Sequence, residues 1–164
     1  MKNDQYSLKE WILTAIRSEM DSYVVYTTLE NKVKNGLMKD RFHFLATEEK
    51  KHQKFLESLF KKTFPKEDLI VPKKSPIPLP EIIIPKDEDI SLSLLLSQAM
   101  IAEQAAQEFY RKLSGKFDDM SVSHMLEYFA DMELGHYRIL QTEKESIERF
   151  EQADIYWPMV HAGP

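Results

Sequence analysis

Two copies of a Glu-x-x-His motif are the residues of this sequence best suited to metal chemistry, Glu49 with His52 and Glu133 with His136. Residues three positions apart on a helix point to the same face, so the carboxylate and imidazole of each motif can bind one ion together. One such motif alone is more often an exposed surface pair. Two copies at matching positions of a repeated pattern predict a dinuclear metal site instead.

A further glutamate precedes each motif on another helical segment, Glu19 before the first and Glu103 before the second. An offset of 84 residues relates position 19 to 103, 49 to 133 and 52 to 136. Aliphatic positions follow the same offset, as Leu29 and Leu113 do. The two halves are therefore interpreted as copies of one helix hairpin, and the predicted metal ligands are Glu19, Glu49, His52, Glu103, Glu133 and His136.

Four carboxylates and two imidazoles at one level of a helical core need a compensating charge, because burial and mutual repulsion both disfavour ionised carboxylates. Two divalent cations balance four carboxylates, and oxygen and imidazole ligands suit iron or manganese. The chain has no cysteine, which excludes disulfides, zinc–thiolate sites and cysteine-ligated iron–sulfur centres. We expect two divalent metal ions per chain, iron or manganese.

Four amphipathic segments must position these residues. Their inward positions recur in alternating steps of three and four, which is the seam of a left-handed helix bundle. The predicted helices cover residues 8–34, 37–62, 92–114 and 120–150. Six of the eight prolines lie from Pro65 to Pro85, so the segment between the hairpins cannot be helical.

The sequence thus predicts an all-α fold, a four-helix bundle built from two helix hairpins with a long crossover connection. A length of 164 residues suits one domain. The expected parts of this domain, residues 1–164, are a hairpin over 7–62, a proline-rich connector over 63–90, a hairpin over 91–150 and a tail over 151–164. The apolar residues of the connector are expected to cover the bundle or a neighbouring subunit.

Charge and hydropathy exclude several classes of partner. The net charge is −5 without a basic block, so we expect no nucleic-acid binding. No stretch approaches the roughly 20 apolar residues of a membrane span, and the first residues lack an apolar signal core, so a cytoplasmic location is expected. Residues 1–62 carry net +3 and residues 91–164 net −6. We expect a homodimer, in which the long connector allows hairpin exchange between chains.

The runs AIRSEMDSYVVYTTLE and FLATEEKKHQKFLESLF resemble the ferritin-like domain of rubrerythrins, as do SQAMIAEQAAQEFYRKLSGK and FADMELGHYRIL. The resemblance covers residues 7–62 and 91–147. It implies a ferritin-like bundle in which the six ligands above bind two irons. It also implies that the reduced iron pair reacts with hydrogen peroxide or dioxygen.

Two departures from the family pattern affect these expectations. Rubrerythrins proper carry a cysteine-bearing rubredoxin segment, which this chain lacks, so we expect an external electron donor such as a rubredoxin-type protein. They also carry an extra glutamate three residues after the ligand that corresponds to Glu103, where this sequence has Ala106. The site is therefore expected to be closer to a symmetric six-ligand version.

For several residues around the predicted ligands, two roles remain open. Tyr26 and Tyr110 each follow a ligand glutamate by seven residues and are candidate catalytic residues. Family tyrosines at this place hydrogen-bond ligand carboxylates, although an ordinary buried tyrosine would also fit a bundle core. Glu48 is a candidate acceptor for the imidazole of the opposite hairpin, or a solvated charge, and Met132 is its counterpart.

The preferred function is a rubrerythrin-like peroxidase or oxidase that uses the external donor for turnover. One alternative is non-catalytic iron binding linked to ferroxidase activity, for storage or detoxification. Another is a di-iron oxygenase that acts on an organic substrate. Family membership alone does not decide among these, because one scaffold supports many chemistries.

Overall fold

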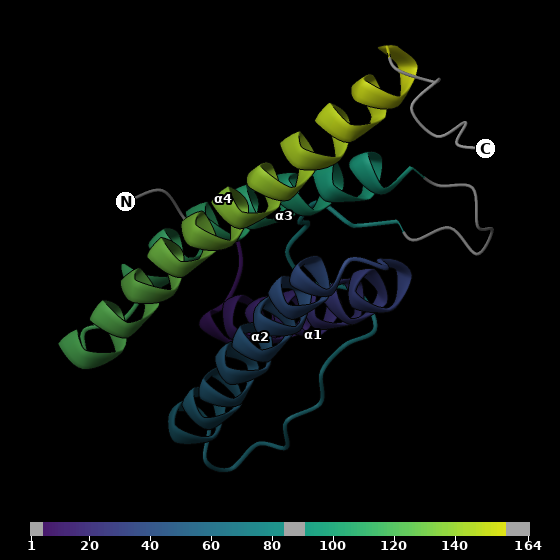
Figure 1. Cartoon of the computed structure of the whole chain (residues 1–164). Coiled ribbons are helices and arrows are strands. Elements are labelled where there is room, and N and C mark those ends of the chain that lie inside the picture. The colour runs from purple at the N-terminus through teal and green to yellow at the C-terminus, as the bar shows by residue number, and fades with distance from the viewer. Residues whose placement is uncertain (1–4, 84–90, 157–164) are drawn as a thin grey trace.

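The computed structural model of the chain describes residues 5–83 and 91–156, which form four helices and no strand within these ranges (Figure 1). The helices are α1 (Leu8–Lys32), α2 (Gly36–Thr63), α3 (Leu92–Ser114) and α4 (Met120–Tyr156). The predicted all-α four-helix fold is confirmed. Only the end of α4 differs substantially, because the helix continues past residue 150 into the segment expected as a tail. Residues 151–156 contain no proline, so nothing of that kind ends the helix at residue 150.

Local signals fix where the helices begin. Ser7 and Glu10 form a reciprocal capping box, in which the Ser7 N–H donates to Glu10 Oε2 at 2.7 Å and the Glu10 N–H donates to Ser7 Oγ at 3.2 Å. Asn35 caps α2 by accepting from the Met38 N–H at 3.2 Å, and Ser91 caps α3 in the same way. These caps satisfy amide groups that the first turn of a helix leaves unpaired.

The helices pair as two hairpins, α1 with α2 and α3 with α4, and the hairpins meet through α1 with α3 and α2 with α4 (Figure 1). One apolar cluster joins the start of α1, the end of α2, the end of α3 and the start of α4. A second cluster joins the opposite ends. Helices α2 and α3 therefore run parallel, which is the predicted crossover topology.

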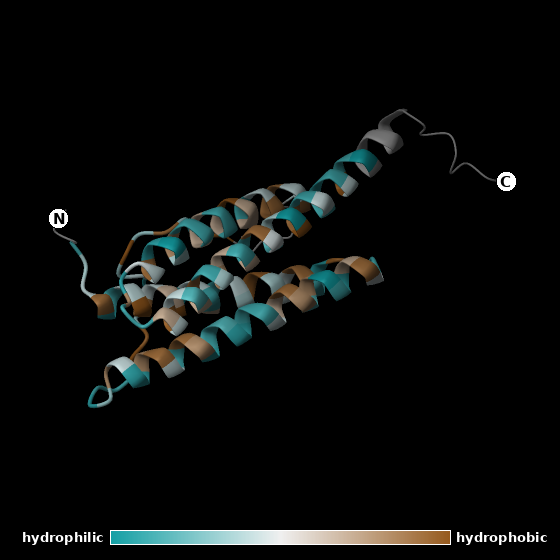
Figure 2. Ribbon diagram, turned by 90° about the vertical axis from the view of Figure 1, so that its left-hand side faces the viewer, coloured by the Kyte–Doolittle hydropathy of each residue, from teal (hydrophilic) through white to brown (hydrophobic). Residues whose placement is uncertain are grey.

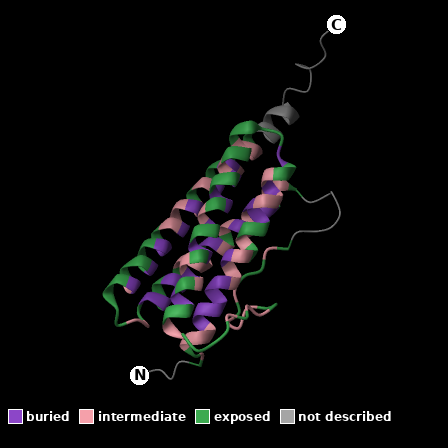
Figure 3. Cartoon of the chain, turned by 90° about the horizontal axis from the view of Figure 1, so that it is seen from below, coloured by how far each residue is buried: buried purple, intermediate pink, exposed green. Residues whose placement is uncertain are grey.

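The two clusters differ in composition. The first, here called the aromatic end, includes Trp11, Phe55, Phe60, Phe109, Tyr110 and Phe129. The second, here called the aliphatic end, includes Val25, Leu29, Leu45, Leu95, Leu96 and Leu140 alongside Tyr26 and Phe42. Buried positions follow the inner faces of the helices (Figure 3), and hydrophilic residues alternate with hydrophobic ones around each helix (Figure 2).

The connector packs on the bundle rather than standing away from it. Leu69, Val71, Ile77 and Leu79 contact the aromatic end, and Ile82 contacts the aliphatic end. The Ile77 N–H donates to Thr14 Oγ1 of α1 at 3.1 Å, and the Ile83 N–H donates to Gln98 Oε1 of α3 at 2.8 Å. Positions 14 and 98 are related by the 84-residue offset, so the connector is fastened to both hairpins at equivalent points.

Within the described residues, no helix has both the length and the apolar character that crossing a bilayer requires.

Candidate metal centre

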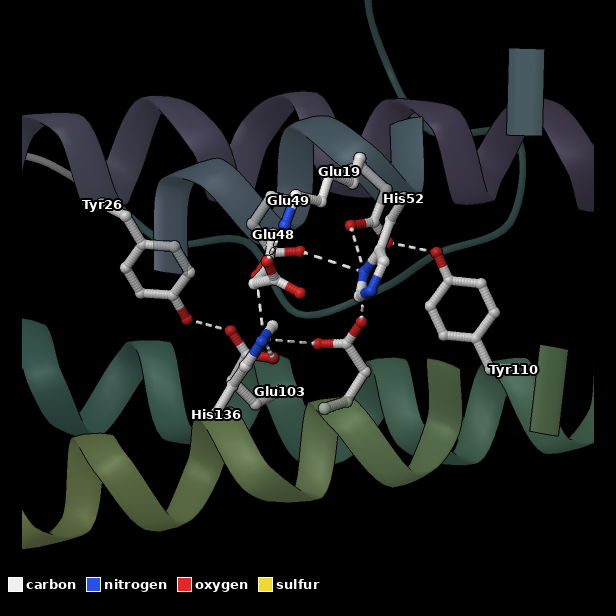
Figure 4. Close-up of polar contacts among 10 residues, drawn as sticks. Glu19, Tyr26, Glu48, Glu49, His52, Glu103, Tyr110 and His136 are labelled. Atoms are coloured by element: carbon white, nitrogen blue, oxygen red, sulfur yellow. Dashed lines mark hydrogen bonds and ion pairs between the residues drawn. The ribbon is translucent and has the colours of Figure 1, made fainter. Parts of the chain in front are cut away.

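The structure brings all six predicted ligands together between the aromatic and aliphatic ends (Figure 4). Each helix contributes, and every one of the six side chains is buried, with at most 3% of the residue exposed. They are Glu19 on α1, Glu49 and His52 on α2, Glu103 on α3, and Glu133 and His136 on α4. The seam positions selected from the sequence are thus one cluster in space.

The donor atoms form two overlapping groups, each within 4.8 Å of one another. One group is Glu19, Glu49, His52 and Glu133, and the other is Glu49, Glu103, Glu133 and His136. Glu49 and Glu133 belong to both groups, so their carboxylates lie where they can bridge two ions. Each remaining glutamate and histidine belongs to one ion position only.

His52 directs Nδ1 into the cluster. This atom lies 3.1 Å from Glu133 Oε1, 3.4 Å from Glu19 Oε2 and 3.5 Å from Glu49 Oε2. Burial lowers the pKa of the imidazole, but the three carboxylates outweigh burial and raise the His52 pKa to about 12. Without a metal ion, the ring is therefore a cation.

His136 has equivalent surroundings on the other side of the cluster. Its Nδ1 lies 3.0 Å from Glu49 Oε1, 3.1 Å from Glu133 Oε2 and 3.6 Å from Glu103 Oε2. Burial again opposes the charged ring, and the surrounding carboxylates again raise the pKa of His136 far above its usual range.

The four carboxylates separate into two kinds. Burial raises the pKa of Glu19 and of Glu103, and the neighbouring carboxylate of Glu133 adds to both shifts. Burial also disfavours charge on Glu49 and Glu133, but there hydrogen bonds, including those to the two imidazoles, lower the pKa below the usual value. In the metal-free protein, these pKa shifts therefore favour the ionised form of the shared pair and the protonated form of the other pair.

The charge balance of the metal-free cluster indicates that the site suits two divalent ions. The two protonated glutamates and two charged histidines cancel the charge of an otherwise tetra-anionic cluster. Two divalent cations supply the same four positive charges. Several buried donor atoms also form no aligned hydrogen bond among the described residues, although some of them lie close to an opposite charge; they are Glu19 Oε2, Glu49 Oε1, Glu133 Oε1, His136 Nε2 and both ring nitrogens of His52. Buried polar atoms that converge without partners are costly unless an ion satisfies them.

Tyr26 and Tyr110 lie at opposite sides of the cluster and bind across the hairpins (Figure 4). The Tyr26 hydroxyl donates to Glu103 Oε1, and the Tyr110 hydroxyl donates to Glu19 Oε1. Burial raises the pKa of Tyr110 well above its usual value, so the phenol remains a donor. Of the two readings open in the sequence, the structure favours tyrosines that hydrogen-bond the carboxylates and thereby orient the two glutamates that are not shared.

Of the two roles left open for Glu48, the structure favours a charge on the flank of α2. Its carboxylate accepts from Lys51 Nζ at 2.5 Å on the flank of α2, and no hydrogen bond links it to His136 in the part of the chain that the structure describes. One residue along a helix rotates a side chain by a large angle, which takes Glu48 off the inward face. Its counterpart Met132 packs against the aromatic end.

An ion pair that the sequence analysis did not identify joins α2 to α4. Arg41 pairs with Glu143, whose side chain is only 4% exposed, whereas that of Arg41 is 38% exposed. The signal was present, because Glu143 continues the three-and-four seam of α4 one step beyond Leu140. The remaining histidines behave as surface residues where they are described: His43 and His124 are exposed, and His161 lies outside the described residues.

Comparisons with known proteins agree with this geometry. The family model for rubrerythrin matches residues 10–144. A solved structure, of a hypothetical protein from Pyrococcus furiosus, is 33% identical, with a TM-score of 0.80, over 91% of this chain and 95% of that one. No curated protein matches this sequence.

Proposed function

We propose that this chain, a member of the rubrerythrin family of di-iron carboxylate proteins, reduces hydrogen peroxide or dioxygen at two irons held by its six clustered ligands. The observation that carries the proposal is the overlap of the two donor groups at Glu49 and Glu133. Such sharing holds two ions close enough for one small molecule to contact both. Manganese remains the alternative metal, because the same donors suit it.

A bound ferrous pair would supply the two electrons needed to reduce hydrogen peroxide to water. The protein contributes the geometry of the site. Glu49 and Glu133 span the two ion positions, while the tyrosine hydroxyls hold one oxygen of Glu19 and of Glu103 in place. A fixed ligand set lowers the reorganisation that a change of metal charge requires.

The closure of the site favours a small reactant. Two surface cavities, of about 550 and 650 Å³, lie between α1 and α2 and between α1 and the connector. None of the six clustered ligands lines either cavity. Peroxide and dioxygen need far less space than an organic substrate, so we place the oxygenase alternative behind the peroxidase or oxidase.

Repeated turnover requires electrons from outside the site. We propose a separate one-electron carrier, such as a rubredoxin-type protein, as the donor, because the sequence contains no cysteine that could ligate such a centre. Iron storage or detoxification without such a donor is the remaining alternative.

Anaerobic loading with ferrous iron, followed by rapid mixing with peroxide or dioxygen, tests the proposal. We expect oxidation of two irons per chain, with continued peroxide consumption when a chemical reductant and a rubredoxin-type protein are added. Glu133→Ala should abolish the reaction, whereas the exposed control His124→Ala should keep it. Uptake of many irons per chain would instead support storage, and iron that peroxide fails to oxidise would contradict a redox role.

A further inference from the structure

A chain of aromatic rings leads from the metal centre toward the surface at the aromatic end. Tyr110, whose hydroxyl donates to Glu19, has its ring centroid 6.4 Å from that of Phe109. The Phe109 ring in turn lies 4.7 Å from the ring of Trp11. The two side chains at the ends of this path, Tyr110 and Trp11, are of the types that lose one electron most readily among uncharged side chains.

A second aromatic layer packs beside this path. The rings of Tyr110 and Phe129 are 5.6 Å apart, and Phe129 stacks on His52 at 4.1 Å. The ligand imidazole and the tyrosine therefore share a neighbour, and the path begins in direct contact with two of the clustered ligands, Glu19 and His52.

The path exists on one side of the repeat only. The 84-residue offset maps Tyr110 onto another tyrosine, Tyr26, but it maps the remaining rings onto aliphatic residues. Trp11 corresponds to Leu95, Phe109 to Val25, Phe129 to Leu45 and Phe55 to Ile139. These counterparts pack in the aliphatic cluster or against it. Since aliphatic residues fill the equivalent space there, filling a core does not by itself require rings at the aromatic end.

The outer end of the path lies just below the protein surface, because Trp11 is a buried residue. Trp11 keeps 8% of its surface exposed, and Lys116 Nζ lies 4.3 Å from the centre of its ring. An ammonium over the indole face stabilises the neutral ring and disfavours a positive charge on it. Trp11 is therefore oxidised only by a strong oxidant, and a donor that reaches the surface readily reduces it again.

We propose that Trp11 is a redox-active residue that donates one electron to the metal centre through Phe109 and Tyr110. The proposal rests on the proposed reduction of peroxide and concerns a centre that holds one ferrous and one ferric ion. Cleavage of the O–O bond of hydrogen peroxide to give two waters takes up two electrons and two protons. The ferrous ion supplies one electron and becomes ferric, and the indole of Trp11 supplies the other.

The Nε1 atom of Trp11 is buried and has no hydrogen-bond partner among the described residues. The oxidised indole therefore keeps its proton as a radical cation, and the net uptake is two protons. An external donor later returns one electron and restores the neutral indole. The relay makes peroxide reduction a two-electron step even when the metals hold a single electron, and it avoids release of hydroxyl radical inside the protein.

The test uses the full-length chain with Trp157→Phe, so that Trp11 is its single tryptophan. The iron-loaded protein is treated with enough ferricyanide to remove one electron per metal pair, mixed with peroxide without a donor, and frozen. Electron paramagnetic resonance then identifies any radical. It compares protein expressed with ordinary tryptophan and protein expressed with ring-deuterated tryptophan. Peptide mass spectrometry locates oxidised residues. We expect a radical signal that narrows on deuteration and oxidation at Trp11.

Matched variants separate the path from general effects on the centre. Trp11→Phe should lose the signal, and Tyr110→Phe should lose most of it. Tyr26→Phe removes the equivalent hydroxyl at the aliphatic end and should keep the signal, with the same iron content as Tyr110→Phe. The fully ferrous protein, mixed with one peroxide per metal pair, should give no radical, because both electrons come from iron.

Three results would overturn the relay. These are a signal that deuteration does not change, equal loss in Tyr26→Phe and Tyr110→Phe, and iron oxidation without any tryptophan radical. The last outcome would leave the proposed function intact. Ferrous iron that peroxide does not oxidise would contradict the proposed function and the relay together. The deuteration comparison needs no substitution at Trp11, so a poorly folded Trp11→Phe protein would not weaken the test.

Discussion

The aromatic and aliphatic ends of the bundle carry the same ligand pattern in different surroundings. At each end, a tyrosine of one hairpin donates to a glutamate of the other, Tyr110 to Glu19 and Tyr26 to Glu103. Beyond the tyrosines, the two ends differ. At the aromatic end, His52 stacks on Phe129. At the aliphatic end, Leu45 occupies the position equivalent to Phe129. The repeat thus preserves what binds the ions and varies what surrounds them.

A second difference concerns how the hairpins are held together. The Arg41–Glu143 pair joins α2 to α4 at the aliphatic end. The equivalent positions at the aromatic end are Met125 and Leu59. Lys62 and Asp119 also pair between the hairpins at the aromatic end, but both side chains are exposed. Among the described residues, the nearly buried ion pair between the hairpins therefore lies at the aliphatic end. If two copies of the first hairpin paired with each other, Arg41 would meet Leu59, so the ion pair favours the pairing of unlike hairpins.

The largest expected effect is loss of bound metal, which should be greater for the two shared ligands than for the two unshared glutamates. Glu49→Ala or Glu133→Ala should lose both ions, because each carboxylate belongs to both donor groups. Glu19→Ala or Glu103→Ala should lose one ion and retain the other. Metal analysis after dialysis against ferrous iron measures the difference, with His124→Ala as the exposed control. Two ions still bound to Glu133→Ala would refute the ligand assignment.

The ion pair should have the next largest effect. Arg41→Met alone leaves a nearly buried carboxylate without its partner and should lower the free energy of unfolding by about 2 to 3 kcal/mol, below the full cost of a buried pair because Arg41 is partly exposed. The double variant Arg41→Met with Glu143→Leu copies the aromatic end and should recover most of this loss. Urea denaturation measures both values, and a double variant as unstable as the single one would contradict the comparison.

The stability of the metal-free protein should depend on pH in a defined direction. Glu19, Glu103, His52 and His136 all have a raised pKa in the folded state. Between pH 8 and 5.5, the folded chain therefore binds more protons than the unfolded chain, and stability rises as pH falls.

Below about pH 4.5, the lowered pKa values of Glu49 and Glu133 reverse the trend. Thermal melts of the metal-free protein across this range test the sign of both trends. A metal-free protein whose melting temperature rises steadily from pH 5.5 to pH 8 would contradict the charge assignment.

The smallest effects should come from the tyrosines. Tyr26→Phe and Tyr110→Phe each remove one hydrogen bond to a ligand carboxylate and should weaken iron binding by about tenfold. The two losses should be similar, because the bonds are equivalent in the repeat. Competitive titration with a chelator measures them, and a large effect at one end alone would show that the tyrosines are not equivalent.

The sequence was sufficient to predict the fold because its signals are local and periodic. Seam spacing, caps at Ser7 and Ser91, and prolines after Pro65 each act within a few residues, and the 84-residue offset placed the ligands at one level. Which hydroxyl meets which carboxylate was not predictable, since Tyr26 bonds the ligand of the other hairpin. The role of Glu48 stayed open for a related reason, because adjacency to Glu49 in sequence does not give adjacency in space, and the contact with Lys51 agrees with the alternative of a flank charge.

The end of α4 and the Arg41–Glu143 pair were missed for different reasons. Residues 151–156 contain no proline or glycine, so nothing in this stretch required the helix to end at 150. Glu143 lay on the seam, but a single polar position there does not identify its partner on another helix. Contacts between hairpins depend on how the helices cross, which periodicity leaves undetermined.

Simultaneous titration of ferrous iron and released protons tests the central claim most directly. In the metal-free site, the raised pKa values of Glu19, Glu103 and both imidazoles favour their protonated forms. Two irons should bind per chain with release of close to four protons, measured anaerobically by calorimetry in buffers of different ionisation enthalpy. Saturation at one iron, or binding of two irons without proton release, would contradict a buried cluster in which two divalent ions replace four protons.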